Sequence, residues 1–282
     1  MSVKKKRLIL KIVLCVMIIG AVVSLTGVIL TYREYENSKK EYNNLQEYVS
    51  VAQVTTPDAA VSKEESTSSS EEEVQDVVEE EPSMIQVSFD MDYASLKEIN
   101  GDLIGWLIYE PIELSYPVVM DKGNDYYEHY SFENEKNVAG AIFLDYLCKP
   151  NLKGFNSIIY GHNMRNGTMF GSLNNVLDNP DMIKENPYFY IFTENEALMY
   201  QIVSGYYTNA SSDTYKLSLD VTLDEMKKYI SYMEDVSTFK DEDFFKEEVT
   251  EDLKLCTLST CHGVQSNSRT VLHGKLVARE PR

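Results

Sequence analysis

Hydrophobic and polar residues are distributed unevenly along the chain, and the pattern changes three times before the main folded region. Residues 12–30 form a run of 19 positions without a charge, which is about the length that a helix needs to span a bilayer. Residues 31–54 mix Tyr and Leu with charged residues at partly helical spacing, which indicates a short helical stalk. Residues 62–81 carry almost no large apolar side chain. They cannot bury enough surface to offset their ordering entropy, so we expect a disordered acidic spacer.

From residue 84 onward the pattern becomes one of short β-like runs. They are rich in Val, Ile, Tyr and Phe, and clusters of Gly, Asn, Asp or Pro separate them. The runs cover residues 112–120, 139–146, 155–160, 188–193, 197–208, 254–260 and 269–278. Many short strands at this spacing predict a mainly β domain, a largely antiparallel barrel or sandwich with peripheral helices.

Three helices are expected beside these strands. Residues 93–100 place Leu96 and Ile99 on one side and end before Gly101, where a helix C-terminus favours glycine. Residues 168–177 are expected to form one helix. The clearest helix covers residues 223–234, just before the last two strands.

This last helix has both a start signal and an apolar face. Thr222 and Glu225 have the spacing of a capping box. Its apolar positions follow a helical period, which predicts core packing rather than a cofactor site. They are Leu223, Met226, Ile230 and Met233.

The net charge of −19 excludes one large class of function. Proteins that bind nucleic acid need a basic face, whereas here the cations cluster before the apolar run. The cations of this cluster are Lys4, Lys5, Lys6, Arg7 and Lys11. Because positive residues flank the cytoplasmic side of a membrane helix, they place the N-terminus in the cytoplasm and the bulk of the chain outside the cell.

These features divide the chain into four parts. Residues 1–11 are predicted to be a cytoplasmic basic tail and residues 12–30 a transmembrane anchor. Residues 31–83 would form the stalk and spacer, and residues 84–282 the folded domain. A cleaved signal peptide is the alternative to the anchor, but no A-x-A-like cleavage site follows the apolar run.

The chain has four cysteines, and Cys15 lies within the apolar run. The other three, an odd number, leave at least one free thiol. If residues 254–260 form a strand, Cys256 and Cys261 lie about 16 Å apart and on opposite faces. A disulfide needs Cα atoms within roughly 7 Å, so this pair is excluded. We expect Cys256 to be a small buried hydrophobe.

Cys261 stands at the end of an apolar, β-branched strand, which would hold its thiol rigidly. Arg269 follows eight positions later, and its guanidinium carries donors in a fixed fork that can bind an oxyanion or a carbonyl. Taken alone, Cys261 could also be a buried structural residue, and Arg269 a surface cation. A nucleophilic thiol needs a base, which is adjacent in space rather than in sequence.

Four histidines compete for that role. His129 lies in an expected surface loop, and His262 follows Cys261 directly and so points away from it on a strand. His162 comes after an apolar strand and enters a Gly/Asn loop, the usual place for a catalytic group on a rigid scaffold. His273 lies on one face of the last strand. The residues alone favour His162 and leave His273 open.

A metal site is a weaker interpretation of the same residues. Cys261, His262 and His273 are the right types, but the paired spacing typical of zinc sites is missing. The acidic residues at 241–243 and 247–252 are expected to be a solvated face. We therefore expect no metal.

The motifs together resemble a family of cysteine transpeptidases, the sortases. They are TLSTC at 257–261 with Arg269 downstream, and YGHNM at 160–164. Further stretches resemble class B of that family, and the likeness covers residues 93–277. These stretches are GWL at 105–107, YPVV at 116–119, NDYY at 124–127 and VLHGKL at 271–276.

The resemblance implies a fold and a mechanism. The fold is an eight-stranded β-barrel with an N-terminal helix and a helix inserted before the Cys strand. Cys261 would cleave a sorting motif after Thr and form a thioacyl-enzyme. His162 would move the proton, and Arg269 would bind the substrate backbone and the oxyanion. No cofactor is needed, and His273 becomes a structural residue.

The resemblance also implies partners. The substrates would be secreted proteins with a C-terminal motif like Asn-Pro-x-Thr-Asn or Pro-Pro-x-Thr-Gly, and the acceptor a peptidoglycan amine in a Gram-positive wall. Ser259, Thr260 and His262 are candidates for contact with substrate, although His262 is not assigned by the family pattern. The alternatives are a cysteine protease that only hydrolyses and a non-catalytic wall-associated scaffold.

Overall fold

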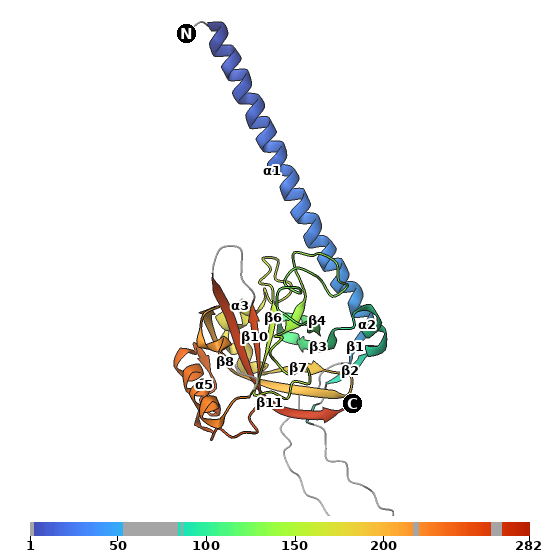
Figure 1. Ribbon diagram of the computed structural model, residues 1–282, viewed down its shortest axis with the longest axis vertical. Coiled ribbons are helices and arrows are strands. Elements are labelled where there is room, and N and C mark those ends of the chain that lie inside the picture. The colour runs from blue at the N-terminus through green and yellow to red at the C-terminus, as the bar shows by residue number, and fades with distance from the viewer. Residues whose placement is uncertain (1–2, 53–83, 86, 217–219, 261–266) are drawn as a thin grey trace, which may run out of the picture.

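The computed structural model describes residues 3–52, 84–85, 87–216, 220–260 and 267–282 (Figure 1). Two predicted site residues, Cys261 and His262, lie outside this part of the chain, and so does most of the predicted acidic spacer. The described residues form a β-barrel surrounded by short helices, from which one long N-terminal helix projects.

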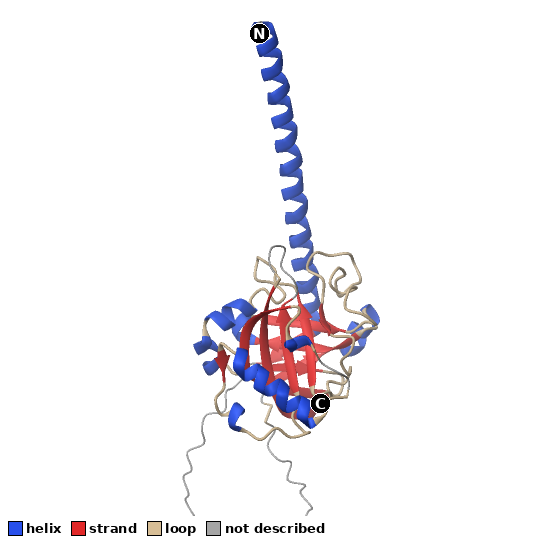
Figure 2. Cartoon of the chain, turned by 60° about the vertical axis from the view of Figure 1, so that its left-hand side comes forward, coloured by secondary structure: helices blue, strands red, loops and turns tan. Residues whose placement is uncertain are grey.

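The barrel closes through eight strands. Around it the order is β11-β10-β6-β5-β4-β3-β7-β8, and β8 pairs back onto β11. A short strand, β9, pairs antiparallel with Ser204 and Gly205 of β8. The bounds are β3 Leu103–Tyr109, β4 Leu114–Val119, β5 Ile142–Leu144, β6 Asn156–Gly161, β7 Tyr188–Phe192, β8 Glu196–Asn209, β9 Phe239–Lys240, β10 Leu255–Thr260 and β11 Ser268–Pro281. The predicted eight-stranded barrel is confirmed, and Figure 2 shows the strands as one curved wall.

The barrel is largely antiparallel, as predicted, but two of its pairs are parallel: β4 with β5, and β6 with β10. One strand, β3, was not among the expected strands. Gly105 interrupts its apolar run, and glycine is unfavourable in the interior of a strand.

The short helices cover the ends and sides of the barrel. They are α2 Tyr93–Ile99, α3 Leu173–Asp178, α4 Pro180–Glu185 and α5 Leu223–Val236, with 3-10 turns η1 Gln46–Tyr48, η2 Glu110–Ile112, η3 Asp213–Tyr215 and η4 Phe244–Lys246. The single helix expected over residues 168–177 was wrong. Met169 has a positive φ, and Gly171 lies so close to the carbonyl of Met164 that residues 168–171 form a tight loop instead. Pro180 then begins a second helix.

The helix predicted before the Cys strand is confirmed as α5, capping box included. Its buried residues Met226, Ile230 and Met233 pack with Val203 and Val271 of the barrel wall in a second hydrophobic cluster. The helix therefore covers the outside of β8 and β11, next to the strands that carry the predicted site.

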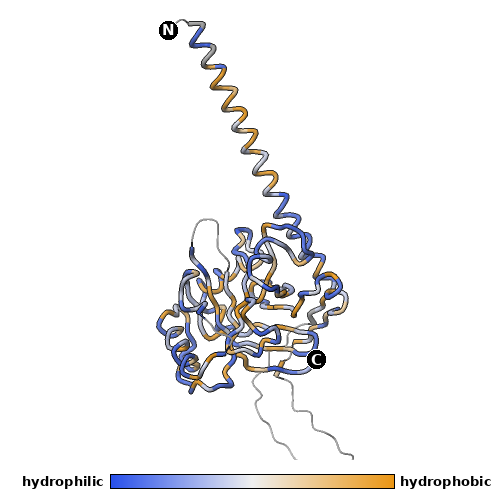
Figure 3. Tube along the Cα trace, in the orientation of Figure 1, coloured by the Kyte–Doolittle hydropathy of each residue, from blue (hydrophilic) through white to orange (hydrophobic). Residues whose placement is uncertain are grey.

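The N-terminal helix α1, Val3–Leu45, joins the predicted anchor and the first part of the stalk in one helix. The helical stalk predicted up to residue 54 was wrong in its last part, since residues 49–52 form a strand. Figure 3 shows that its outer part is hydrophobic, whereas the part that meets the domain is hydrophilic. An 18-residue window has a mean hydropathy of 2.8, and none of it is buried. Length and composition allow this helix to cross a membrane, although a signal sequence passes the same test.

After the acidic segment, the chain pairs with the strand that follows α1. Strand β1, Val49–Ala52, pairs antiparallel with β2, Ser88–Met91, so that Ala52 lies opposite Ser88. The end of α1 is already packed on the barrel before the acidic segment begins, since Tyr42 and Leu45 belong to the main core. The predicted domain boundaries remain a prediction.

Candidate active site

The candidate site lies where three neighbouring strands meet at one end of the barrel. Strands β6 and β10 are parallel, and their last residues, Gly161 and Thr260, are partners in register. His162 follows the first of these residues in the chain, and Cys261 follows the second. Strand β11 begins at the same end, next to β10, and Arg269 is its second residue (Figure 1).

The imidazole of His162 is half-buried and held by a backbone carbonyl. Its Nε2 lies 2.7 Å from the carbonyl oxygen of Glu128. A carbonyl oxygen only accepts, so Nε2–H must donate, and in the neutral ring Nδ1 carries the free lone pair. The backbone of His162 is fixed as well, because its carbonyl accepts from the amide of Phe170 at 3.0 Å.

Glycine at position 140 is needed for this arrangement. Gly140 has a φ of +56°. A Cβ there would lie 2.4 Å from the carbonyl oxygen of Tyr127 and 3.1 Å from Cδ2 of His162. Any side chain at this position would push on both the imidazole and the loop that holds it.

The guanidinium of Arg269 has unused hydrogen-bonding capacity. Its Nη1 is buried, and it has no hydrogen-bond partner in the part of the chain that the structure describes. Leaving a charged donor buried and unpaired is costly, so such groups are usually found where a ligand supplies the acceptor. A substrate carbonyl or an oxyanion fits this requirement.

A chain of hydrogen bonds joins the three strand ends. Thr260 Oγ1 accepts from the amide of Thr270 at 2.9 Å, and the hydroxyl of Thr270 donates to Oδ1 of Asn174 in α3. Asn174 Nδ2 in turn donates to Oδ1 of Asn163 at 3.1 Å. Three of these four residues are neighbours in sequence of the predicted catalytic positions, so the network fixes the spacing of the site.

The other described histidines are not placed for catalysis. His273 is fully buried, with Nδ1 2.8 Å from Thr257 Oγ1 and Nε2 2.9 Å from the hydroxyl of Tyr206. Burial lowers the pKa of His273 to about 3, so it stays neutral as a structural residue. His129 is exposed on its loop.

The two described thiols of the barrel are also inert. Cys256 is free and buried, as predicted, and burial raises its pKa well above the ordinary value. Cys148 is half-buried, and its pKa is raised to about 11. A nucleophile must be a thiolate, so neither residue competes with Cys261 for that role.

The comparisons with known proteins identify the family of the chain. The sequence matches the family model of the sortase domain over residues 110–277. It is 32% identical to sortase B of Listeria monocytogenes over 188 residues, which cover 65% of this chain and 73% of that protein. The chain belongs to the sortase family, class B.

Solved structures agree with this assignment. Sortase B of Clostridium perfringens superposes with a TM-score of 0.59 at 31% identity, over 66% of this chain and 99% of that one. A structure of Bacillus anthracis sortase B in complex with AAEK1 gives a TM-score of 0.64 at 26% identity, over 87% and 99% of the two chains. A sortase is a cysteine transpeptidase, so the protein is an enzyme of this class.

The side chains of the two predicted substrate contacts on β10 face into the fold of this sortase. Ser259 and Thr260 are buried. Ser259 Oγ lies 2.7 Å from the hydroxyl of Tyr215, and Thr260 Oγ1 binds the amide of Thr270. Direct contact of these residues with substrate remains a prediction, as does that of His262.

A pocket of about 200 Å³ opens beside Arg269. The rings of Tyr160 and Tyr215 stack along it at 6.2 Å, which gives it an aromatic wall. Its lining is Asn124, Glu128, Phe143, Tyr160, Ala210, Tyr215 and Arg269. Neither Glu128 nor Tyr215 could be predicted from the sequence, because neither lies in a motif that carries the chemistry.

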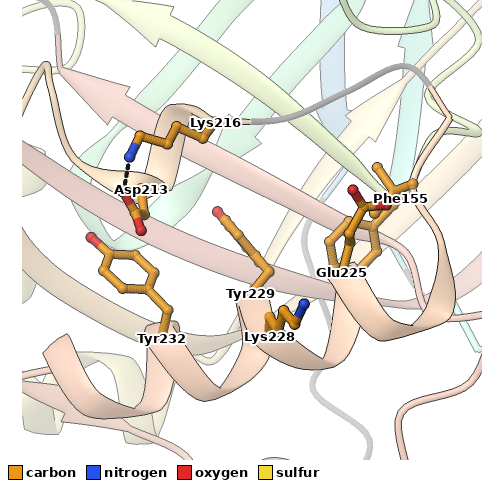
Figure 4. Close-up of a pocket in the computed structure, with 8 residues that line it drawn as sticks. Phe155, Asp213, Lys216, Glu225, Lys228, Tyr229 and Tyr232 are labelled. Carbon is orange, nitrogen blue, oxygen red and sulfur yellow. Dashed lines mark ion pairs between the residues drawn. The ribbon is translucent and has the colours of Figure 1, made fainter.

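A second pocket lies away from these residues, between η3 and α5 (Figure 4). Tyr229 and Tyr232 rise from α5 toward η3, where Lys216 and Asp213 form an ion pair at 2.6 Å. None of the predicted site residues lines it, so it is not part of the candidate site. Among the residues that the structure describes, no group of three His, Cys, Asp or Glu side chains could hold a metal ion.

Proposed function

We propose that this sortase cleaves a C-terminal sorting motif of secreted proteins after Thr and transfers the acyl group to a peptidoglycan amine. The observation that carries the proposal is the parallel register of Gly161 and Thr260. It aligns the residue before His162 with the residue before Cys261. Arg269, whose Nη1 has no hydrogen-bond partner among the described residues, lies on the next strand.

In the first half of the reaction the thiol proton of Cys261 passes to Nδ1 of His162, and the resulting thiolate attacks the carbonyl carbon of the motif's Thr. The Cys–carbon bond forms, the negative charge moves to the carbonyl oxygen, and Arg269 stabilises that charge. The carbon–nitrogen bond then breaks. His162 protonates the departing amine from Nδ1, since Nε2–H is bound to the carbonyl of Glu128. The product is a thioacyl-enzyme.

In the second half an amine attacks the thioester. His162, now neutral, accepts a proton at Nδ1 from the attacking nitrogen, the new amide bond forms, and the Cys261 thiolate leaves. The same imidazole thus serves as acid and then as base. Water in place of the amine would give hydrolysis, which is the protease alternative.

The location follows from the N-terminal helix. We propose that α1 anchors the protein in the cell membrane with the basic tail in the cytoplasm and the barrel outside. The apolar, unburied outer part of the helix supports this arrangement. The enzyme would then meet secreted proteins and wall precursors of a Gram-positive cell at the membrane surface.

The experiment that tests the function uses the full chain in detergent micelles with labelled peptides carrying Asn-Pro-x-Thr-Asn or Pro-Pro-x-Thr-Gly. We expect slow hydrolysis alone, and a new amide product when an amine such as a peptidoglycan stem peptide is added. If added amine never enters the product, transpeptidation is wrong. If Cys261→Ala keeps full activity, the thiol mechanism is wrong.

A further inference from the structure

We propose that the end of α1 positions the imidazole of His162, and that Tyr42 is the positioning residue. The docking segment is defined as residues 38–46, where α1 and η1 meet the barrel. The inference rests on the proposed catalytic role of His162. It assigns to the N-terminal helix a part in the reaction beyond that of an anchor.

The docking segment binds the loop that holds the imidazole. Tyr42 is only 5% exposed, and its hydroxyl donates to the carbonyl oxygen of Gly140 at 2.6 Å. One turn earlier, Ser38 is hydrogen-bonded to Asn137. The carboxylate of Glu41 accepts from the side chain of Asn137 at 3.3 Å and from the amide of Glu133 at 3.1 Å.

The same loop is in direct contact with the imidazole. Glu128 supplies the carbonyl that binds Nε2, and a Cβ at Gly140 would lie 3.1 Å from the ring carbon Cδ2, so the loop leaves little space beside the imidazole. The two ends of the loop are tied together, because the amide of Ala141 donates to the carbonyl of Tyr127 at 2.9 Å. Tyr42 therefore acts on His162 through a single intervening residue, Gly140.

Tyr42 also supports the other side of the histidine. Its ring packs edge-on against Tyr116, with the centroids 5.3 Å apart. The hydroxyl of Tyr116 accepts from the amide of Met169 at 3.1 Å, and Met169 forms a bridge with Asn163, the residue after His162. The side chain of Tyr42 thus contacts the Gly140 loop directly and is linked to the segment around Met169 through Tyr116.

One residue of the docking segment, Gln46, contacts the barrel away from the residues around the imidazole. Gln46 donates to the backbone carbonyl of Ser115 and accepts from its hydroxyl, both at 2.9 Å. These two bonds fasten the segment to β4 without touching the residues around the imidazole. The chain therefore supplies a matched control, since Gln46 contributes to docking and Tyr42 to docking and positioning.

A displaced imidazole affects the chemical step more than substrate binding, because proton transfer depends steeply on geometry. In the full chain in detergent micelles, we expect Tyr42→Phe to lower kcat for peptide transfer about tenfold, with KM changed less than twofold. Gln46→Ala should leave kcat within about twofold, and so should Tyr32→Phe on the exposed part of the same helix.

Two results would overturn the inference. One is a Tyr42→Phe enzyme with the kcat of the wild type. The other is a Gln46→Ala enzyme that loses as much kcat as Tyr42→Phe, because docking in general would then explain the effect. Thermal unfolding of each variant verifies that it is folded, and Tyr42→Phe keeps the ring and so its packing.

His162→Ala in the same assay distinguishes a failure of the proposed mechanism from a failure of the inference about Tyr42. If that variant keeps its activity, the proposed mechanism fails and the positioning role fails with it. If His162→Ala is inactive while Tyr42→Phe has full activity, only the inference about α1 fails.

Discussion

At the scale of single residues, the site combines a histidine that hydrogen bonds hold in place with an arginine whose Nη1 has no partner among the described residues. His162 has its Nε2 bound to Glu128 and its backbone bound to Phe170, so the ring has little freedom. Arg269 has a buried Nη1 without a hydrogen-bond partner among the described residues. A fixed imidazole such as that of His162 suits proton transfer, and a free donor such as Nη1 of Arg269 suits binding of an oxyanion.

The role of Arg269 can be tested by Arg269→Lys. Lys keeps the charge but cannot present a planar fork, so we expect kcat/KM to fall by about 100-fold, the usual cost of one oxyanion donor. Arg279→Lys is the matched control on the same strand, because its Nη1 already pairs with Glu196 at 2.7 Å. Peptide cleavage kinetics measure both. An Arg269→Lys enzyme within threefold of the wild type would contradict the assignment.

His273 predicts how stability depends on pH. Its pKa is about 3 in the fold and 6.5 when unfolded, so between these values the unfolded chain binds more protons. The free energy of unfolding should therefore fall as pH drops from 6.5, by up to about 1.4 kcal/mol per pH unit from this residue. Denaturant unfolding at pH 7 and pH 5 measures this, and the free energy of unfolding should fall less between the two pH values in His273→Gln than in the wild type. Equal slopes would show that His273 does not titrate as expected.

At the scale of elements, much of the barrel could be predicted because most strands are runs rich in Val, Ile, Tyr and Phe that end at clear breakers. Strand β3 was not predicted, since Gly105 interrupts its apolar run. The helix expected at 168–177 failed because helical spacing does not reveal that Gly171 must press on the backbone of Met164. Helix α5 was predicted well because its cap and its apolar face both lie within one short stretch of sequence.

The same reasoning explains what could be predicted of the site. His162 and Arg269 lie in motifs, so the sequence marks them. The carbonyl that holds the imidazole comes from Glu128, and any residue type could supply it. Tyr42 lies among charged residues and resembles an exposed stalk position, so only the fold reveals its burial.

The cap of α5 gives a prediction at this scale. The hydroxyl of Thr222 accepts a hydrogen bond from the amide of Glu225, and the carboxylate of Glu225 accepts one from the amide of Thr222. Thr222→Ala should lower the free energy of unfolding by about 1 kcal/mol and leave transfer activity unchanged. Thr222→Ser should restore stability, because the hydroxyl returns. Denaturant unfolding measures this, and an unchanged midpoint for the Ala variant would show that the cap contributes nothing.

At the scale of the whole molecule, the long helix and the barrel form one continuous unit. The apolar run ends near Thr31, and Ser38 is already bound to the barrel. Seven helical residues span about 10 Å, so in the proposed topology the barrel lies close to the membrane surface. The acidic segment starts after Ala52 and therefore does not set this distance.

A deletion tests this view of the acidic segment. We expect that replacing residues 58–80 by eight Gly and Ser residues leaves kcat and KM for peptide transfer within about twofold. The reason is that the contacts described for the docking segment and for the strand ends of the site are all made by residues outside it. A tenfold loss of kcat in the deletion variant, with its thermal stability intact, would show that the acidic segment takes part in the reaction.

The most direct test of the central claim is the intact mass of the full chain after mixing with a sorting peptide in the absence of amine. We predict a mass increase equal to the acyl part of the peptide, located on Cys261, absent in Cys261→Ala and removed when an amine is added. A peptide that is cleaved after Thr without any adduct on Cys261, and equally well by Cys261→Ala, would contradict it.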